Sequence, residues 1–442
     1  MKTRLLIRLL ICLVIFVCFG ASFAMAEEWP QWLGPTRNSV WNEKGIIRQF
    51  PKDGPKVLWK SKVSGGFSGP AVAGNKVFVP DFVVKSGDST NDFNKRDERS
   101  GNERLLCFDA KSGALLWKYE YPVAYKISYA SGPRVTPSVV DGKVYGLGAE
   151  GNFFCLDVNT GKPIWTKDFK KDYNAPTPLW GFCGHPLIKG DLVYCLVGGE
   201  GSVAVAFNKD TGKEVWKALS ASESGYCPPT LINAAGVDQL LIWDADKLNS
   251  LDLVSGKVYW SLPLKPSYGM SVSAPVKDGD LLYAGGIGSI GAGFKLSSDK
   301  PGASILWQGT RESALYPCNS TPFAENGIVY GTDCHQGWLG AFKMLSGERL
   351  WTDFKPTTGK RTTHGTAFLV KNDDHFYLAS ETGDLICAKV SPKGYEEISR
   401  ANLLKPTNAA FNRDVLWSHP AFANKCIYWR NDAELICVSL AE

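Results

Sequence analysis

The sequence lacks the features that mark several classes of protein. It contains no run of basic residues, so it offers no electrostatic footprint for nucleic acid. No Cys-x-x-Cys or Cys-x-x-Cys-His spacing occurs, which removes the usual signatures of zinc sites and c-type haem. No segment shows sustained helical periodicity, which argues against a helical fold.

A short apolar run lies at the start of the chain. Leu9 to Phe19 follows three basic residues and precedes Ala24-Met25-Ala26, a pattern typical of a secretory signal. The run is too short to anchor the chain. Lipid attachment would require a small residue directly before Cys18, and none is present there. We therefore expect residues 1–26 to be removed, leaving a periplasmic or secreted chain without a transmembrane span.

The bulk composition is that of a globular protein rich in turns and strands. The 442 residues carry a formal charge of +5 and are 44% apolar and 21% charged, which is ordinary for a globular chain. The counts of 45 Gly, 15 Trp and 16 Tyr favour turn-rich β structure.

Most cysteines of the exported part lie singly in apolar strand patterns such as LLCFD and FFCLD, where a buried thiol is expected. The segment KCIYWRNDAELICV is the exception. A two-residue turn at Asn431-Asp432 would place Cys426 opposite Cys437 on paired strands, where Cβ atoms are about 4.5–5.5 Å apart. We take this pair as a candidate disulfide.

A phrase that ends in tryptophan recurs along the chain. DVNTGKPIW has a polar residue, a Ser/Thr-Gly turn and a Trp four residues after the Gly. The Trp begins an outer strand, where its ring can wedge against the next unit, so truncation should cost about 3–5 kcal/mol. The structural tryptophans are Trp59, Trp117, Trp165, Trp216, Trp260, Trp307 and Trp351.

A second phrase recurs between the tryptophan phrases. A Pro is followed by an apolar strand, a turn and another strand in eight copies; the Pro positions, with Thr366 in one of them, lie 43 to 67 residues apart. Each unit resolves into four short strands joined by turn residues, which predicts one blade of a propeller.

The ends of the chain predict how the ring closes. The last unit has only three strands, whereas PKVLWKSKV near the start belongs to no unit of its own. We therefore predict an all-β, eight-bladed propeller in which an N-terminal strand completes the last blade. The expected organisation is a signal at 1–26, a lead segment at 27–55 and one propeller domain at 56–442.

The two repeated phrases resemble the pyrroloquinoline-quinone-like propeller repeat, and WPQWLGPTRNSVW resembles the lead of exported bacterial members. The resemblance covers the whole predicted mature chain. It implies one of two roles, a quinoprotein dehydrogenase or a scaffold similar to the outer-membrane assembly factor BamB.

The dehydrogenase role implies features that can be sought in the sequence. Such enzymes resemble one another in adjacent cysteines beside the quinone, calcium ligands, a catalytic Asp and insertions that roof the funnel. This sequence has no adjacent cysteines, its insertion at 84–103 has the polarity of a solvated loop, and the acids of Trp243-Asp244-Ala245-Asp246 fit an exposed hairpin. We identify no catalytic residue.

Loops of all units converge at the ring axis, where ligands bind in such folds. Imidazoles and thiolates there could ligate a metal, but they come from units that are far apart, so we expect none. The rim forms a ligand contact surface or lines a water-filled channel. Candidate ligand-binding residues on and near the rim are Trp180, Cys183, His185, Tyr226, Cys227, Tyr316, Cys318, His364, Trp417 and His419.

The sequence favours an exported, non-enzymatic propeller that acts as a binding or assembly scaffold in the cell envelope. Its expected partners are envelope proteins or an extracellular polymer, and no cofactor is expected. One alternative is an oxidoreductase for alcohols or sugars that uses pyrroloquinoline quinone with calcium. A second alternative is a carbohydrate or envelope-polymer binder that uses the aromatic rim.

Overall fold

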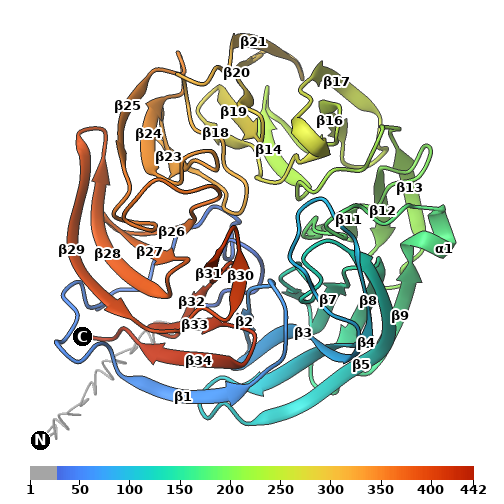
Figure 1. Ribbon diagram of the computed structural model, residues 1–442. Coiled ribbons are helices and arrows are strands. Elements are labelled where there is room, and N and C mark those ends of the chain that lie inside the picture. Colours follow the sequence, from blue (N-terminus) through green and yellow to red (C-terminus); the bar gives the residue numbers. More distant parts are fainter. Residues whose placement is uncertain (1–26) are drawn as a thin grey trace, which may run out of the picture.

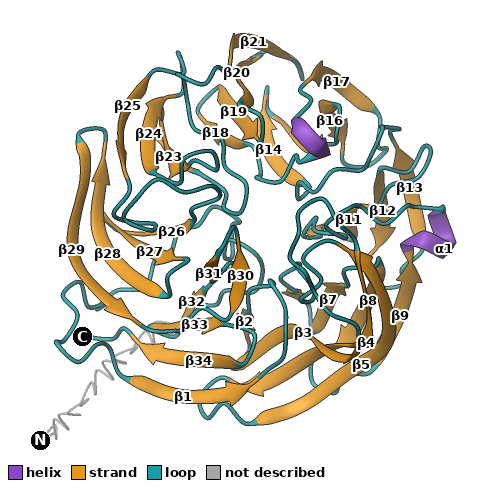
Figure 2. Cartoon of the chain, in the orientation of Figure 1, coloured by secondary structure: helices purple, strands orange, loops and turns teal. Residues whose placement is uncertain are grey.

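The computed structural model describes residues 27–442, and the predicted signal at 1–26 lies outside them. The described chain is built of strands, with one short helix, α1 (Phe169–Tyr173), and one 3-10 turn, η1 (Ser267–Gly269). Eight antiparallel sheets of four strands surround a common axis, as in a β-propeller (Figure 1, Figure 2). The predicted all-β class and four-stranded units are confirmed.

The first four sheets follow one another along the chain. Sheet 1 contains β2 (Ala71–Ala73), β3 (Lys76–Ser86), β4 (Asp97–Asp109) and β5 (Leu115–Ile127). Sheet 2 contains β6 (Ser138–Val140), β7 (Lys143–Leu147), β8 (Asn152–Asp157) and β9 (Pro163–Asp168). Sheet 3 contains β10 (Leu187–Lys189), β11 (Leu192–Leu196), β12 (Ala204–Asn208) and β13 (Glu214–Ala218). Sheet 4 contains β14 (Thr230–Ala234), β15 (Val237–Trp243), β16 (Lys247–Asp252) and β17 (Val258–Pro263).

The next three sheets repeat the same order, from the axis outward. Sheet 5 contains β18 (Val276–Asp278), β19 (Leu281–Gly286), β20 (Ile290–Leu296) and β21 (Ala303–Gln308). Sheet 6 contains β22 (Phe323–Glu325), β23 (Ile328–Thr332), β24 (Leu339–Lys343) and β25 (Arg349–Asp353). Sheet 7 contains β26 (Ala367–Asn372), β27 (His375–Ser380), β28 (Asp384–Ser391) and β29 (Gly394–Asn402).

Sheet 8 joins the two ends of the described chain. It contains β32 (Ala421–Ala423), β33 (Cys426–Arg430), β34 (Glu434–Ser439) and β1 (Val57–Lys62). β1 runs antiparallel to β34 with Trp59 opposite Cys437, and the two strands lie side by side in Figure 1. A separate hairpin of β30 (Asn408–Ala410) and β31 (Arg413–Val415) connects sheets 7 and 8.

The predicted pairing of Cys426 directly opposite Cys437 is wrong, because the register of β33 on β34 differs from the expected one. Cys426 faces Ser439 and Cys437 faces Tyr428, and both cysteines are free thiols. The connection is longer than a two-residue turn, because the Asn431 side chain accepts hydrogen bonds from the backbone N–H groups of residues 433 and 434. The longer loop shifts the pairing by two residues.

The recurring turn phrase has a side-chain basis. Asp157 Oδ1 accepts hydrogen bonds from Asn159 N, Thr160 N and Thr160 Oγ1 at 3.1, 2.8 and 2.8 Å. Gly161 follows with a φ of +68°, which glycine adopts without steric cost. The same side-chain closure, in which a carboxylate or amide oxygen accepts and a hydroxyl donates, occurs in three further turns, at Asp109–Ser112, Asn208–Thr211 and Asp252–Ser255.

The tryptophan of one sheet packs on the turn glycine of the next. A Cβ added to Gly113 would lie 2.6 Å from the Trp59 ring, and one added to Gly161 would lie 2.5 Å from the Trp117 ring. The Trp59 indole N–H also donates to Ala110 O at 2.9 Å. Equivalent N–H bonds to the next sheet's turn or loop come from Trp117, Trp165, Trp216, Trp307 and Trp351.

Trp260 departs from this pattern. Its indole N–H donates to Gln239 Oε1 in its own sheet at 3.1 Å, and the following sheet 5 has the longer turn LSSDKPG in place of the usual one. Sheet 7 has no tryptophan in its outer strand β29. The contacts between sheets 4 and 5 and between sheets 7 and 8 are therefore made without an indole N–H of this type.

The lead segment crosses one face of the ring. Trp29 forms an antiparallel bridge with Val72 in β2, and Pro30 O accepts the backbone N–H of β6. Trp41 N then donates to Lys371 O in β26 at 2.8 Å. Residues 29–41 thus connect sheets 1 and 2 with sheet 7. Within residues 27–442, no helix has the length and apolar character required to cross a membrane.

We predict that Gly113→Ala destabilises the protein more than Gly142→Ala. The two glycines have φ of +71° and +72°, so both variants incur about 1 kcal/mol of backbone strain. Only at Gly113 does the added methyl collide with an indole, whereas nothing lies within 4 Å at Gly142. Overpacking should add about 1–3 kcal/mol. Chemical denaturation of both variants measures the difference; equal losses would contradict the docking role of Trp59.

Candidate functional site

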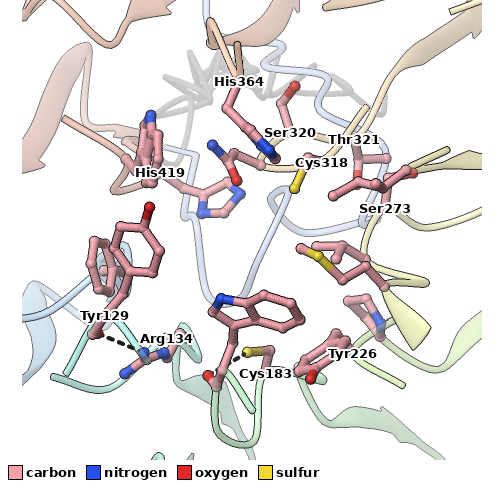
Figure 3. Close-up of a pocket in the computed structure, with 18 of the residues that line it drawn as sticks. Tyr129, Arg134, Cys183, Tyr226, Ser273, Cys318, Ser320, Thr321, His364 and His419 are labelled. Carbon is pink, nitrogen blue, oxygen red and sulfur yellow. Dashed lines mark hydrogen bonds between the residues drawn. The ribbon is translucent and has the colours of Figure 1, made fainter. Parts of the chain in front are cut away.

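A cavity of about 330 Å³ lies at the ring axis. In Figure 3 its labelled side chains surround an open space, with Arg134 and Tyr129 on one side and Ser273 and Thr321 on the other. Aromatic side chains dominate its wall: Trp32, Phe67, Phe93, Tyr129, Trp180, Tyr226, Tyr268, Phe411 and Trp417.

The structure brings most of the predicted rim residues to this cavity. Those that line it are Trp180, Cys183, His185, Tyr226, Cys318, His364, Trp417 and His419. Cys227 is buried behind the wall, with its thiol next to the carbonyls of Pro228 and Ser273. Tyr316 is also buried and donates its hydroxyl to Thr310 O at 2.6 Å. The latter two residues therefore support the wall from outside.

The lead segment forms part of the cavity floor. The Trp32 ring lies against the imidazole of His185, with centroids 4.8 Å apart and planes 9° apart, and meets His419 edge-on. Arg37 lies 5.2 Å from the Trp32 ring centroid and donates to Pro186 O at 2.9 Å. The N-terminal segment is thus held by the inner ends of distant sheets.

The insertion between β3 and β4 is mostly exposed, as predicted for a solvated segment, but its tip reaches the mouth of the cavity, which the prediction did not include. β3 and β4 extend into this region, and Phe93 at its tip stacks on Phe411 of the β30–β31 connection at 6.2 Å. Asn91 Nδ2 donates to Asn408 Oδ1 and to Ala409 O at 3.0 and 2.8 Å. Two hairpins therefore cover part of the opening.

The three histidines of the cavity are neutral at pH 7. Burial lowers the pKa of His364 and of His419 to about 4. Burial, with His419 and Arg37 nearby, also holds the pKa of His185 well below its usual value. His185 Nδ1 accepts the backbone N–H of Thr136 at 3.0 Å, which requires an unprotonated Nδ1.

The two thiols of the cavity are also uncharged. Burial raises the pKa of Cys183 to about 11, against the opposing effect of Arg134, and raises that of Cys318 to about 12. A thiol attacks as its thiolate, so neither group is an active nucleophile at neutral pH. Arg134 is then the one permanently charged side chain among the described residues that line the cavity.

A buried carboxylate fixes one wall. Glu381 is fully buried; it accepts hydrogen bonds from Arg413 Nε at 2.7 Å and from Trp417 Nε1 at 3.0 Å. Burial raises the pKa of Glu381, and the bonds from Arg413 oppose that rise. The charges of Glu381 and Arg413 balance each other, and the hydrogen bond from Trp417 to Glu381 orients the indole. The Trp417 ring centroid lies 6.0 Å from that of Tyr129.

Three polar atoms of the cavity wall are buried without a hydrogen-bond partner in residues 27–442. They are Trp32 Nε1, Tyr226 Oη and His419 Nδ1. An unpaired buried polar group costs about 1–3 kcal/mol, so such groups are rare in the absence of a ligand or water. Each of these atoms has almost no accessible surface, so they lie just behind the face of the wall rather than on it.

Several residues of the cavity escaped the sequence prediction. Three of them lie in segments that belong to no repeat: Trp32, Phe93 and Phe411. The recurring Pro motif, which located the rim, therefore could not predict them. Arg134 lies only two residues before Thr136, just outside the predicted rim. A search for aromatic residues in the non-repeating segments would have found the first three.

The donor set does not fit a calcium-bound quinone. Calcium takes six to eight oxygen ligands, commonly with carboxylates among them, but no Asp or Glu of residues 27–442 lines the cavity. The paired acids of the sequence lie elsewhere, and Asp244 is buried rather than in an exposed hairpin as predicted. Its carboxylate accepts hydrogen bonds from the backbone of Asp246 and Lys247 and from Asn249 Nδ2.

We predict that stability falls as the pH drops from about 6.5 to about 4. The pKa of His364 and His419 is about 4 in the folded chain and about 6.5 when unfolded, so the unfolded chain binds more protons in this window. Each histidine contributes a slope of up to about 1.4 kcal/mol per pH unit. Urea titrations of the wild type and of a His364→Gln/His419→Gln variant test this; an unchanged slope in the variant would refute it.

Comparisons with known proteins agree with this architecture. A family model described as outer membrane protein assembly factor BamB matches residues 101–352, more than half of the chain. BamB of Burkholderia pseudomallei is 23% identical over 49% of this chain and 50% of its own length. Quinoprotein alcohol dehydrogenase PedH of Pseudomonas putida is 27% identical over 40% of this chain and 30% of its own length.

The chain therefore spans about half or less of the length of these two curated relatives. The crystal structure of BamB from Moraxella catarrhalis superimposes with a TM-score of 0.56 and 16% identity, over 87% of this chain and 97% of that one. This likeness shows the shared fold. From the match over residues 101–352, the chain belongs to the family described as outer membrane protein assembly factor BamB.

Proposed function

We propose that this chain is an exported scaffold of the cell envelope that holds a ligand or a segment of a partner in its central cavity. The eight sheets act as the blades of one ring, which β1 closes by pairing with β34. Membership of the BamB family supports an assembly role, with envelope proteins as partners. Binding at the axis, in a cavity lined by several sheets, is typical of this architecture.

The observation that carries the proposal is that the histidines and thiols of the cavity have pKa values unsuited to acid–base or nucleophilic chemistry. General acid–base catalysis needs a group whose pKa lies near the working pH, whereas His364 and His419 have pKa values of about 4. Nucleophilic catalysis by cysteine needs a lowered pKa, whereas that of Cys183 is raised to about 11. A wall of aromatic rings, with neutral histidines and thiols beside a single arginine, supports binding rather than chemistry.

An oxidoreductase would be revealed by titration with quinone and calcium. We expect no stoichiometric binding of pyrroloquinoline quinone with Ca²⁺ below about 100 µM in calorimetry, because the cavity wall supplies no carboxylate to the ion. Dye-linked oxidation of alcohols or sugars should stay at the rate of the quinone alone. Stoichiometric binding accompanied by turnover would overturn the scaffold proposal in favour of the enzyme.

Contact with an envelope partner is testable at the mouth of the cavity. Tyr268 lines the mouth and is 63% exposed, whereas Val254, in the β16–β17 turn, is 76% exposed and does not line it. We expect p-benzoylphenylalanine in place of Tyr268 to crosslink an exported or outer-membrane protein in intact cells, identified by mass spectrometry. The same substitution of Val254 is the control. Equal products from both positions, or none from Tyr268, would contradict the proposed contact.

A further inference from the structure

The charge and shape of the cavity indicate which ligand it binds, an inference that rests on the proposed binding function. We infer that the cavity accepts a planar aromatic monoanion, an aromatic carboxylate of one or two fused rings. Its carboxylate pairs with the guanidinium of Arg134, and its ring system packs against the aromatic wall. The argument depends on the donors of Arg134, the lack of an ion-pair partner for it among the described residues, and the aromatic, apolar wall.

Arg134 is held in place and still has donors to offer. Its guanidinium donates to Gly132 O, to Ser128 O at 2.9 Å and to Tyr129 O at 2.7 Å, and it lies 5.3 Å from the centroid of the Phe67 ring. These contacts use three of the five N–H groups of the side chain. The guanidinium also lies within hydrogen-bonding reach of the Cys183 thiol. A fixed guanidinium with N–H groups that no protein oxygen accepts is well suited to a carboxylate.

No carboxylate on the described wall of the cavity balances this cation. The nearby Glu103, whose pKa burial raises against the opposing effect of Arg134, is instead bound by the hydroxyls of Tyr121 and Tyr125 and by the backbone N–H of Ala149. Arg413, which lies near the same opening, is instead neutralised by Glu381 at 2.7 Å. Cys183 and Cys318 stay protonated because burial raises the pKa of each thiol. A half-buried cation in an apolar cavity therefore favours a ligand with one negative charge.

The aromatic wall favours a flat ligand over a sugar. Trp180 and Tyr226 meet edge to face at 5.6 Å, and His364 stacks on Phe411 at 4.9 Å. Edge-to-face and offset stacked packing are the favourable arrangements for a further ring. Met270, Val272 and Ile287 add an apolar surface to the wall.

The polar residues of the wall are mostly satisfied by the protein itself. Ser273 Oγ donates to Gly285 O at 2.9 Å, Ser320 Oγ pairs with Thr332 Oγ1 at 2.9 Å, and Asn319 Nδ2 donates to Thr366 Oγ1 at 3.2 Å. A monosaccharide, with about five hydroxyl groups, would find too few partners.

The volume sets the size of the ligand. At about 330 Å³ the cavity lies at the small end of the range for ligand pockets, about 300–1,000 Å³. It is bounded on one side by Trp32 of the lead segment and at the mouth by Phe93 and Phe411. A naphthalene-sized body fits this space, whereas a chain of several sugars would have to lie across the mouth.

Calorimetry with three probes of the same shape tests the inference on the full mature protein. The probes are 2-naphthoate, the neutral 2-naphthamide and the cationic 2-naphthylmethylamine, at pH 7.5. We expect 2-naphthoate to bind at least tenfold more tightly than 2-naphthamide, because a hydrogen bond to a charged group contributes about 1.5–3 kcal/mol. The amine should bind most weakly. In Arg134→Met the acid and the amide should bind alike.

Arg349→Met is the matched control. Arg349 also lies over an aromatic ring, 4.7 Å from Trp338, and also donates to backbone carbonyls, but it does not line the cavity. This variant should keep the tenfold preference. Equal affinity of the wild type for acid and amide, a preference that persists in Arg134→Met, or no binding of any probe at 5 mM would overturn the ligand class. The crosslink at Tyr268 does not depend on these probes, so it still reports on the scaffold proposal when they fail.

Discussion

The contact between an outer-strand tryptophan and the turn of the next sheet is the interaction on which the rest of the structure depends. The indole lies where a Cβ would otherwise be, and its N–H donates to a backbone carbonyl of the neighbouring sheet. The indole packing and the N–H bond are both directional. At the six junctions where the N–H bond occurs, they fix the distance and the angle between consecutive sheets. At four of these turns an Asp or Asn side chain closes the turn, and the glycine that receives the indole has a positive φ.

Because the outer strands hold the sheets together, the residues near the ring axis can differ from sheet to sheet. The inner strands are short, and the residues that precede them differ from sheet to sheet. The lead segment closes one side with Trp32 and Arg37, while the β3–β4 and β30–β31 hairpins narrow the other with Phe93 and Phe411. An axial opening is thereby converted into a cavity, and all these segments lie outside the repeat.

Burial sets the electrostatics of the cavity. Buried histidines and thiols remain neutral, and the buried Glu381 is paired with Arg413 behind the wall. Arg134 donates to the backbone carbonyls of Ser128 and Tyr129 rather than to a carboxylate. The same fold can thus host either chemistry or binding, and the side chains at the axis decide between them.

By itself the sequence determined the strand class, the four-stranded unit and the place of the tryptophans, because these follow from local turn chemistry and a repeat with a period of about fifty residues. It also led to eight of the ten predicted ligand-binding residues lining the cavity. Tertiary structure decided the rest. The register of Cys426 depends on one loop closed by Asn431, and Trp32, Phe93 and Arg134 reach the axis through contacts between segments far apart in the chain. No periodic pattern encodes such contacts, because each is made only once.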